Sequence, residues 1–204
     1  MLLKPFGPEI LHTSLDEGLT EELYQICIKH QDDLSKRYNR SLTGWLQKEM
    51  NIYSDIQSKI LPAFVDIVLQ YLNNCSIPKL RAFSKRDVSC RASWANIQQP
   101  HEFHPIHNHM LDDIVLVCFP KIDIKSKCPY PTQTEVNPGT LTFHFGENLR
   151  NFGTTTYSVV PKTGDVFVFP GGLKHYTYPV FDDDIRISTS TNFTFTEYYN
   201  AGKN

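Results

Sequence analysis

The sequence predicts a mainly β protein of the α+β class, in which N-terminal helices precede a sandwich or barrel of strands. Two observations carry this prediction. Helical periodicities fill the first third of the chain, and short runs of β-branched and aromatic residues between Pro and Gly turns fill the rest. With 204 residues, of which 40% are hydrophobic and 12% aromatic, the chain can bury a full-sized core. We expect one domain over 1–204, with helical support over 1–80 and the strand core over 81–198.

Two segments in the first third of the chain have the spacing of amphipathic helices. The first covers residues 13–38 and carries Asp16 and Glu17 where the first turn of a helix favours acidic side chains. The second covers residues 52–72, with apolar residues every three or four positions and a predicted kink at Pro62. We expect both apolar faces to pack on the core.

The remaining two thirds of the chain predicts strands. Runs of β-branched and aromatic residues are bounded by turn sequences such as Pro138-Gly139 and Pro170-Gly171-Gly172. The candidate strands cover residues 87–97, 113–119, 140–145, 157–160, 165–169, 174–179 and 185–196. Strands of this length and spacing are typical of a sandwich or a barrel.

Composition excludes several classes of partner. A formal charge of −2, from 20 basic and 22 acidic residues, favours neither a nucleic acid nor a membrane surface. No stretch approaches the roughly 20 apolar residues of a membrane span. The five cysteines are scattered and odd in number, which argues against a disulfide framework or a zinc knot. We expect a soluble, cytoplasmic protein that acts on a small molecule or another protein.

The segment HPIHNHMLDD, residues 104–113, places three histidines within six positions. On an extended strand residues i and i+2 point the same way, roughly 6 to 7 Å apart, so His107 and His109 can present two nitrogens to one metal ion. His104 then falls on the opposite face. In a helix His104 would pair with His107 instead, but Pro105 disfavours that conformation. A solvated loop is the alternative explanation of the cluster.

Two ligands hold a first-row metal poorly, so a third has to come from elsewhere in the chain. His144 on a strand and His175 in FPGGLKHYTYP are the candidates. We expect His175, because it follows the turn at 170–172 and begins a short strand that can aim its imidazole into a barrel mouth. Three ligands on one side of the ion leave other positions open for substrate and oxygen.

The order of features in VVPKTGDVFVFPGGLKHYTYPVFDDDIRISTSTNF, with SWANIQ, IVLVCFP and PGTLTFHFG before it, resembles the iron(II)- and 2-oxoglutarate-dependent oxygenases. The similarity is strongest to their phage and bacterial branch with an HxH segment, and it covers roughly residues 88–195. It implies a double-stranded β-helix, a jelly-roll or cupin-like barrel, buttressed by the N-terminal helices. For a phage-encoded protein the cytoplasm would be that of the host.

The resemblance assigns roles to particular residues. It makes His107 the first histidine of the family's His-Xaa-acid/His motif and His175 the distal histidine. Arg186, eleven residues after His175, stands where the family binds the far carboxylate of 2-oxoglutarate. A guanidinium group forks two hydrogen bonds to a carboxylate and stays charged, which suits that task. Ser188 on the same strand face, and Asn96 in SWANIQ, could hydrogen-bond the cosubstrate.

This sequence departs from the family's commoner pattern at the middle ligand. That ligand is usually Asp or Glu, whereas here the position holds His109. A neutral imidazole in place of a carboxylate leaves the iron site one charge unit more positive. Asp112 or Asp113 could supply a carboxylate if the chain bulges after His109, and Asp113 is the reserve candidate. Asp113 otherwise begins the next strand.

The resemblance implies a dioxygenase that uses Fe(II), 2-oxoglutarate and O2. It would hydroxylate an unidentified substrate while decarboxylating 2-oxoglutarate to succinate. Family analogy favours a protein side chain such as proline, with small molecules as the other option. Two alternatives remain open: a cupin-like metalloenzyme that does not use 2-oxoglutarate, and a non-catalytic jelly-roll protein whose histidines bind a structural metal.

Overall fold

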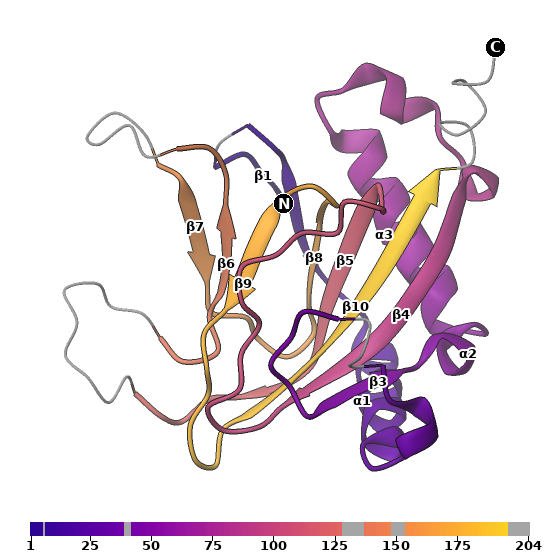
Figure 1. The fold of residues 1–204 in the computed structure, drawn as a ribbon. Coiled ribbons are helices and arrows are strands. Elements are labelled where there is room, and N and C mark those ends of the chain that lie inside the picture. Colours follow the sequence, from indigo (N-terminus) through magenta and orange to yellow (C-terminus); the bar gives the residue numbers. More distant parts are fainter. Residues whose placement is uncertain (6, 39–41, 128–136, 148–153, 196–204) are drawn as a thin grey trace.

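The computed structural model describes residues 1–5, 7–38, 42–127, 137–147 and 154–195, whose strands form two antiparallel sheets (Figure 1). The larger sheet has the order β1-β2-β8-β5-β10-β4-β3. Its strands are β1 (Leu2–Leu3), β2 (Ile10–Ser14), β8 (Asp165–Pro170), β5 (Ile114–Asp123), β10 (Ile185–Phe195), β4 (Val88–Gln98) and β3 (Lys48–Asn51). The smaller sheet has the order β7-β6-β9, from β7 (Thr156–Val159), β6 (Leu141–His144) and β9 (Lys174–Thr177).

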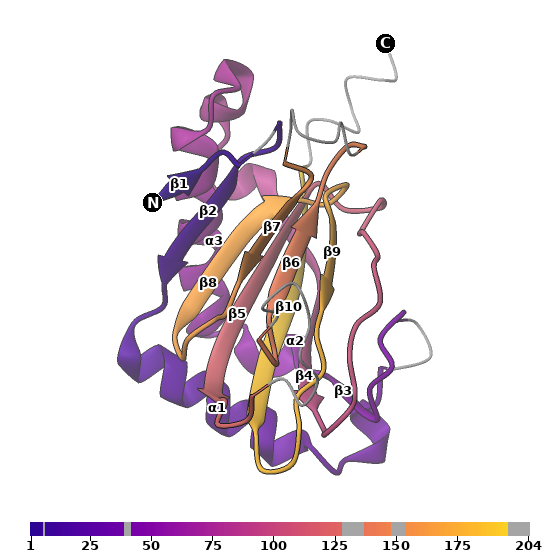
Figure 2. The ribbon, with the colours of Figure 1, turned by 90° about the vertical axis from the view of Figure 1, so that its left-hand side faces the viewer.

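Helices and the small sheet cover opposite faces of the large sheet (Figure 1). Figure 2 shows the small sheet in front of the large one. Each face has its own apolar cluster, because successive residues of a strand point to opposite sides. In β5, Leu116 and Cys118 pack with the helices, whereas Val117 and Phe119 pack between the sheets. Burying such side chains contributes about 1.5–3 kcal/mol each, so this alternation fixes the register of β5.

Helix α1 (Glu17–His30) and helix α3 (Ile60–Asn74) lie against the large sheet, with the short α2 (Tyr53–Ile56) between them in sequence. Asp16 caps α1 by accepting hydrogen bonds from the backbone N–H groups of Gly18 and Leu19. Short 3-10 helices cover Leu34–Lys36, Pro78–Ala82 and Lys85–Asp87. Among the described residues, no helix is long and apolar enough to cross a membrane.

The helix boundaries differ from those predicted. The segment 13–38 is helical only from Glu17 to His30, since residues 10–14 form β2 and pair with β8. The predicted helix at 52–72 is divided into α2 and α3. The kink predicted at Pro62 is wrong, because Pro62 lies in the first turn of α3, where the backbone N–H has no partner within the helix.

All the strands predicted after residue 80 are present, as β4 to β10, but β1, β2 and β3 were not predicted. Strand β3 has the sequence KEMN, which carries neither β-branched residues nor an alternating pattern. It is a strand because it pairs with β4 at the edge of the large sheet, with Glu49 opposite Asn96. The mainly β class with N-terminal helices is confirmed.

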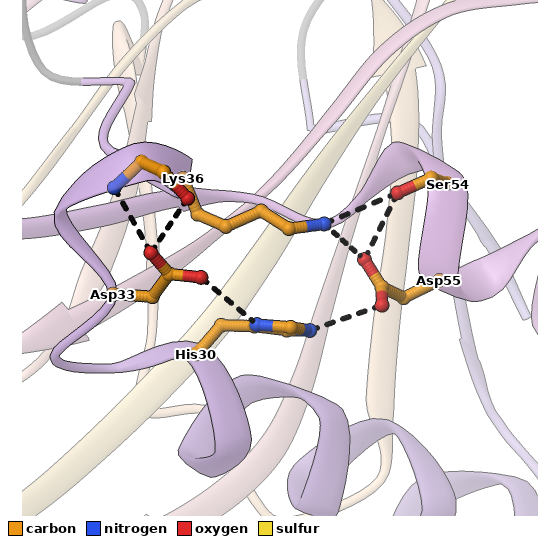
Figure 3. Close-up of polar contacts among 6 residues, drawn as sticks. His30, Asp33, Lys36, Ser54 and Asp55 are labelled. Atoms are coloured by element: carbon orange, nitrogen blue, oxygen red, sulfur yellow. Dashed lines mark hydrogen bonds and ion pairs between the residues drawn. The ribbon is translucent and has the colours of Figure 1, made fainter.

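A polar cluster joins the end of α1 to α2 (Figure 3). Asp55 accepts hydrogen bonds from His30 at 3.0 Å, from Lys36 at 2.8 Å and from Ser54 at 3.1 Å. Burial raises the pKa of Asp55, but these hydrogen bonds outweigh it and lower the pKa to about 2. The cluster therefore stabilises the packing of the helical layer.

Candidate metal and cosubstrate site

A cavity of about 370 Å³ lies between the two sheets. Alternate residues of β4 and β10 form its wall on the large sheet, because they share the face that the helices do not cover. These residues are Ala92, Trp94, Asn96, Arg186, Ser188, Ser190 and Asn192. Leu141, His175 and Thr177 line it from the small sheet. The wall formed by β4 and β10 is largely polar, unlike the apolar clusters elsewhere, which favours a binding function.

Three histidines meet at this cavity. His107 and His175 form a backbone bridge, with N–H to carbonyl distances of 3.0 and 2.9 Å. The N–H of His109 donates to the carbonyl of Gly171 at 2.7 Å. These bonds fix the histidine segment against the turn before β9 and the start of that strand. One ligating nitrogen from each of His107, His109 and His175 lies within 4.8 Å of the others.

Gly171 permits this close approach. A β-carbon at this position would lie 2.0 Å from the carbonyl oxygen of Asp112 and 2.7 Å from that of His109. Both are backbone atoms that cannot move without displacing the segment. The turn therefore has to carry glycine for residues 109–112 to pack on it.

Hydrogen bonds set the tautomers of two of the imidazoles. Nδ1 of His107 lies 2.8 Å from the carbonyl of Pro105, and Nδ1 of His175 lies 3.0 Å from that of Leu173. Since a carbonyl can only accept, each Nδ1 carries the proton and each Nε2 keeps a free lone pair. His109 instead stacks on Trp94, with ring centroids 5.8 Å apart.

Burial keeps all three imidazoles neutral at neutral pH. It lowers the pKa of His107, lowers that of His109 to about 4, and lowers that of His175 well below the usual range. Neutral imidazole is the form that binds metal. The donor set therefore fits a first-row divalent ion such as iron(II).

The other candidate ligands lie elsewhere. His144 is on β6 and lines a neighbouring groove with His101 and Tyr176, and among the described residues it is not part of the histidine cluster. The Asp112 carboxylate bonds Asn192 and Arg91. The carboxylate of the reserve candidate, Asp113, accepts from the hydroxyl of Thr194 and the N–H of Phe195. Within the described residues, neither carboxylate belongs to the histidine cluster.

His104 does not fall on the opposite face, as a continuous strand would require. Residues 104–109 form no regular strand, and the chain bends at Ile106. His104 therefore lines the same cavity, with its ring centroid 5.9 Å from that of His107. Its Nε2 lies 3.3 Å from Oε1 of Glu49.

Arg186 is a buried cation without a carboxylate partner. Its side chain is 1% exposed, and within the described parts of the chain no acidic group lies within ion-pair distance. Nε donates to the carbonyl of Gly139 at 3.0 Å, and Nη1 lies 3.4 Å from the hydroxyl of Ser188. Burial lowers the pKa of Arg186 to about 9, so it stays charged at neutral pH. A desolvated charge of this kind is costly unless an anion pairs with it.

The remaining predicted residues adjoin Arg186. Ser188 lies opposite Asn96 in the pairing of β10 with β4, and both side chains line the cavity. Oδ1 of Asn96 is buried and has no hydrogen-bond partner among the described residues. An unpaired guanidinium and an unpaired amide oxygen thus face the cavity that holds the histidines. Such a wall fits a polar, anionic cosubstrate.

Residues 92–192 match the sequence model of a family described as "Putative 2OG-Fe(II) oxygenase". The match covers about half of the chain and contains the three histidines, Arg186, Ser188 and Asn96. The chain belongs to this oxygenase family. It is therefore an oxidoreductase that uses iron(II), 2-oxoglutarate and dioxygen, as its sequence predicts. No curated protein shows a significant sequence match to it.

Solved structures share the fold of this oxygenase. A prolyl-4-hydroxylase from Pseudomonas putida is 14% identical, with a TM-score of 0.57 over 91% of this chain and 92% of that one. A Trichoplax adhaerens prolyl hydroxylase, in complex with a hypoxia inducible factor peptide fragment, is 13% identical, with a TM-score of 0.62 over 96% and 87%. HygX from Streptomyces hygroscopicus, with nickel and 2-oxoglutarate bound, is 10% identical, with a TM-score of 0.58 over 92% and 82%. The predicted double-stranded β-helix is confirmed.

Sequence reasoning missed the buried carboxyl group of the cavity, Glu49. It lies on β3, is 0% exposed, and its Oε2 has no partner among the described residues. Burial, with a smaller contribution from the charge of Glu102, raises the pKa of Glu49 to about 7. Nothing in KEMN indicates a site, because only the pairing of β3 with β4 turns this side chain inward.

Proposed function

We propose that His107, His109 and His175 hold the iron(II) of this oxygenase, and that Arg186 holds 2-oxoglutarate with help from Ser188 and Asn96. One observation carries the proposal: three neutral imidazoles and one unpaired, buried guanidinium line a single cavity. The histidines are neutral ligands, so a bound iron(II) ion would keep its two positive charges. The anionic cosubstrate can balance them.

Bound iron(II) and 2-oxoglutarate supply the oxidising chemistry, in which dioxygen is consumed, 2-oxoglutarate loses carbon dioxide to give succinate, and a substrate C–H becomes C–OH. The chain's own residues orient the reactants. The hydrogen bonds that Nδ1 of His107 and of His175 donate fix the two rings and leave each Nε2 lone pair free, so that these nitrogens would hold the ion. Arg186 fixes the far carboxylate, and the apolar cluster behind the cavity limits access of water.

We further propose that the substrate is a protein side chain, with proline among the options. The structurally similar Trichoplax hydroxylase binds a peptide, which supports this choice. Residues 1–204 would act as one oxygenase domain. Its part up to residue 80 supports the strand core over 81–198, consistent with the packing of α1 and α3 on the large sheet.

Succinate formation tests the proposed function. Protein supplied with iron(II), 2-oxoglutarate and oxygen should release succinate, and Arg186→Met should reduce this release strongly at limiting 2-oxoglutarate. Oxygen uptake without succinate would favour the cupin-like alternative that does not use 2-oxoglutarate. Metal binding without oxygen uptake or succinate would favour a structural metal site.

A further inference from the structure

A carboxylate to which the oxygenase chemistry assigns no role lies in the same cavity. Glu49 is fully buried, and its Oε1 has one partner, Nε2 of His104 at 3.3 Å. Its Oε2 is buried and lacks a hydrogen-bond partner within the described residues. A carboxylate desolvated in this way costs free energy unless its free oxygen is paired with a hydrogen-bond donor or a cation. The side chain lines the cavity, so that partner can come from a bound molecule.

The chain packs closely around this carboxylate. A β-carbon at Gly44 would lie 2.5 Å from Oε1 of Glu49 and 3.0 Å from the ring of His104. The segment containing Gly44 therefore covers the pair directly and leaves no room for a side chain. The open side of the carboxylate is the cavity, which Gly44, Glu49 and His104 all line.

The position of Glu49 separates it from the cosubstrate site. Glu49 on β3 lies opposite Asn96 on β4, which in turn lies opposite Ser188 on β10. Two strand spacings, about 10 Å, therefore separate Glu49 from Ser188 across the sheet. The cavity has the Arg186 guanidinium at one end and Glu49 at the other, where a bound cation would hold the Glu49 carboxyl group in its ionised form. A dianion fits the first end and a cation fits the second.

Two aromatic rings line the cavity on the side of Glu49, because Trp94 lies two residues along β4 from Asn96, the register partner of Glu49. Tyr38 and Trp94 both line the cavity, with ring centroids 5.8 Å apart. The backbone N–H of Tyr38 donates to the carbonyl of Glu49 at 2.8 Å, which ties the segment carrying this ring to β3. Aromatic faces beside a carboxylate attract ammonium and guanidinium groups through cation–π interaction as well as charge.

We propose that Glu49 determines substrate specificity and that the substrate carries an alkylammonium or guanidinium group, which the Glu49 carboxylate binds beside Tyr38 and Trp94. This inference rests on the proposed function and narrows its substrate class. A lysine or arginine side chain meets the requirement, and so does a free amine. A prolyl substrate would meet it only with a cationic neighbour.

Paired probes test the inference. Each pair compares a cationic probe with a neutral one of similar shape. Two pairs carry amino-acid side chains: Nα-acetyl-lysine methylamide with its norleucine counterpart, and Nα-acetyl-arginine methylamide with its citrulline counterpart. The third pair, butylamine with butanol, distinguishes a small amine from an amino-acid side chain. Binding is read anaerobically from the perturbation of the visible band of the iron(II)–2-oxoglutarate complex. In the wild-type protein at least one cationic probe should bind tenfold or more tightly than its neutral counterpart. In Glu49→Gln this ratio should fall to about one, while the matched surface variant Glu22→Gln should keep it.

Different outcomes would refute the proposed oxygenase function and the specificity role of Glu49. If the visible band does not form in the wild-type protein, the proposed function fails. If the band forms but every neutral probe binds as tightly as its cationic counterpart, the specificity role of Glu49 is wrong and the oxygenase function stands. The same conclusion follows if Glu49→Gln keeps the tenfold ratio. The wild-type comparison needs no variant, so the absence of a cation preference there refutes the role of Glu49 even if Glu49→Gln folds poorly.

Discussion

Replacing Arg186 by methionine should stabilise the protein without ligand and remove its response to 2-oxoglutarate. Arg186 is 1% exposed, and its guanidinium has no carboxylate partner among the described residues. Methionine is also long and flexible, so it fills much of the same space without a charge. A residue kept for ligand binding at the expense of stability should show these opposite effects.

The size of the stability effect follows from the pKa of Arg186. Burial lowers it from its ordinary value to about 9, which corresponds to a penalty of about 5 kcal/mol for the charged form. The folded pKa of this base is depressed, so the penalty is fully present below pH 9 and disappears only above the unfolded value. Methionine also loses the hydrogen bond to Gly139 and the cation–π contact with the Phe119 ring, 5.1 Å away, which together cost about 2–4 kcal/mol in return. We expect Arg186→Met to gain about 1–3 kcal/mol at pH 7.5.

Urea denaturation with and without ligand measures both effects. With manganese(II) present, 2-oxoglutarate at a hundred times its dissociation constant should stabilise the wild-type protein by about 2.7 kcal/mol. The same concentration should stabilise Arg186→Met by less than about 1 kcal/mol, since losing one partner of a buried charge pair costs about 2–5 kcal/mol of binding. A ligand-free Arg186→Met protein that is less stable than wild type by more than about 1 kcal/mol would show that the buried guanidinium stabilises the fold. Arg186 would then be a structural residue.

Three further predictions concern the surroundings of the site. Asp55→Asn should lower the free energy of unfolding by about 2 kcal/mol at pH 7. Because the folded pKa of Asp55 is depressed, this loss should be complete above its unfolded pKa of 3.8 and fade as the pH falls toward 2 (Figure 3); a pH-independent difference in urea denaturation would contradict it. Gly171→Ala should displace the histidine segment and weaken manganese(II) binding at least tenfold in calorimetric titration, and unchanged affinity would show that the segment tolerates the clash with Asp112. Asp113→Ala should cost about 1–3 kcal/mol of stability through its two lost hydrogen bonds yet keep the metal stoichiometry, whereas loss of the metal would identify Asp113 as a ligand.

The strand core was predictable because its signal is local. Runs of β-branched and aromatic residues between turn sequences mark β4 to β10, and local sequence largely decides such elements. Strand β3 carries no such pattern, since its conformation depends on pairing with a distant strand. The split between α2 and α3 was likewise hidden, because the apolar periodicity continues across residues 57–59.

Part of the candidate site could be predicted because few types of side chain bind a metal ion or a carboxylate. His107, His109 and His175 could be grouped because few residue types bind a first-row metal, and Arg186 because its spacing from His175 matches a family pattern. His104 was assigned to the wrong face because its position depends on an irregular loop. Glu49 could not be found at all, since only the sheet register brings it into the cavity.

An anaerobic titration of the protein with iron(II) and 2-oxoglutarate tests the metal and cosubstrate assignment most directly. We expect a visible charge-transfer band that saturates at a single equivalent of iron and is lost in His107→Ala and in His175→Ala. The control His144→Ala should keep the band, because His144 lines a neighbouring groove and, in the part of the chain that the structure describes, lies outside the histidine cluster. A folded wild-type protein that gives no band, or a band that survives both histidine substitutions, would contradict the assignment.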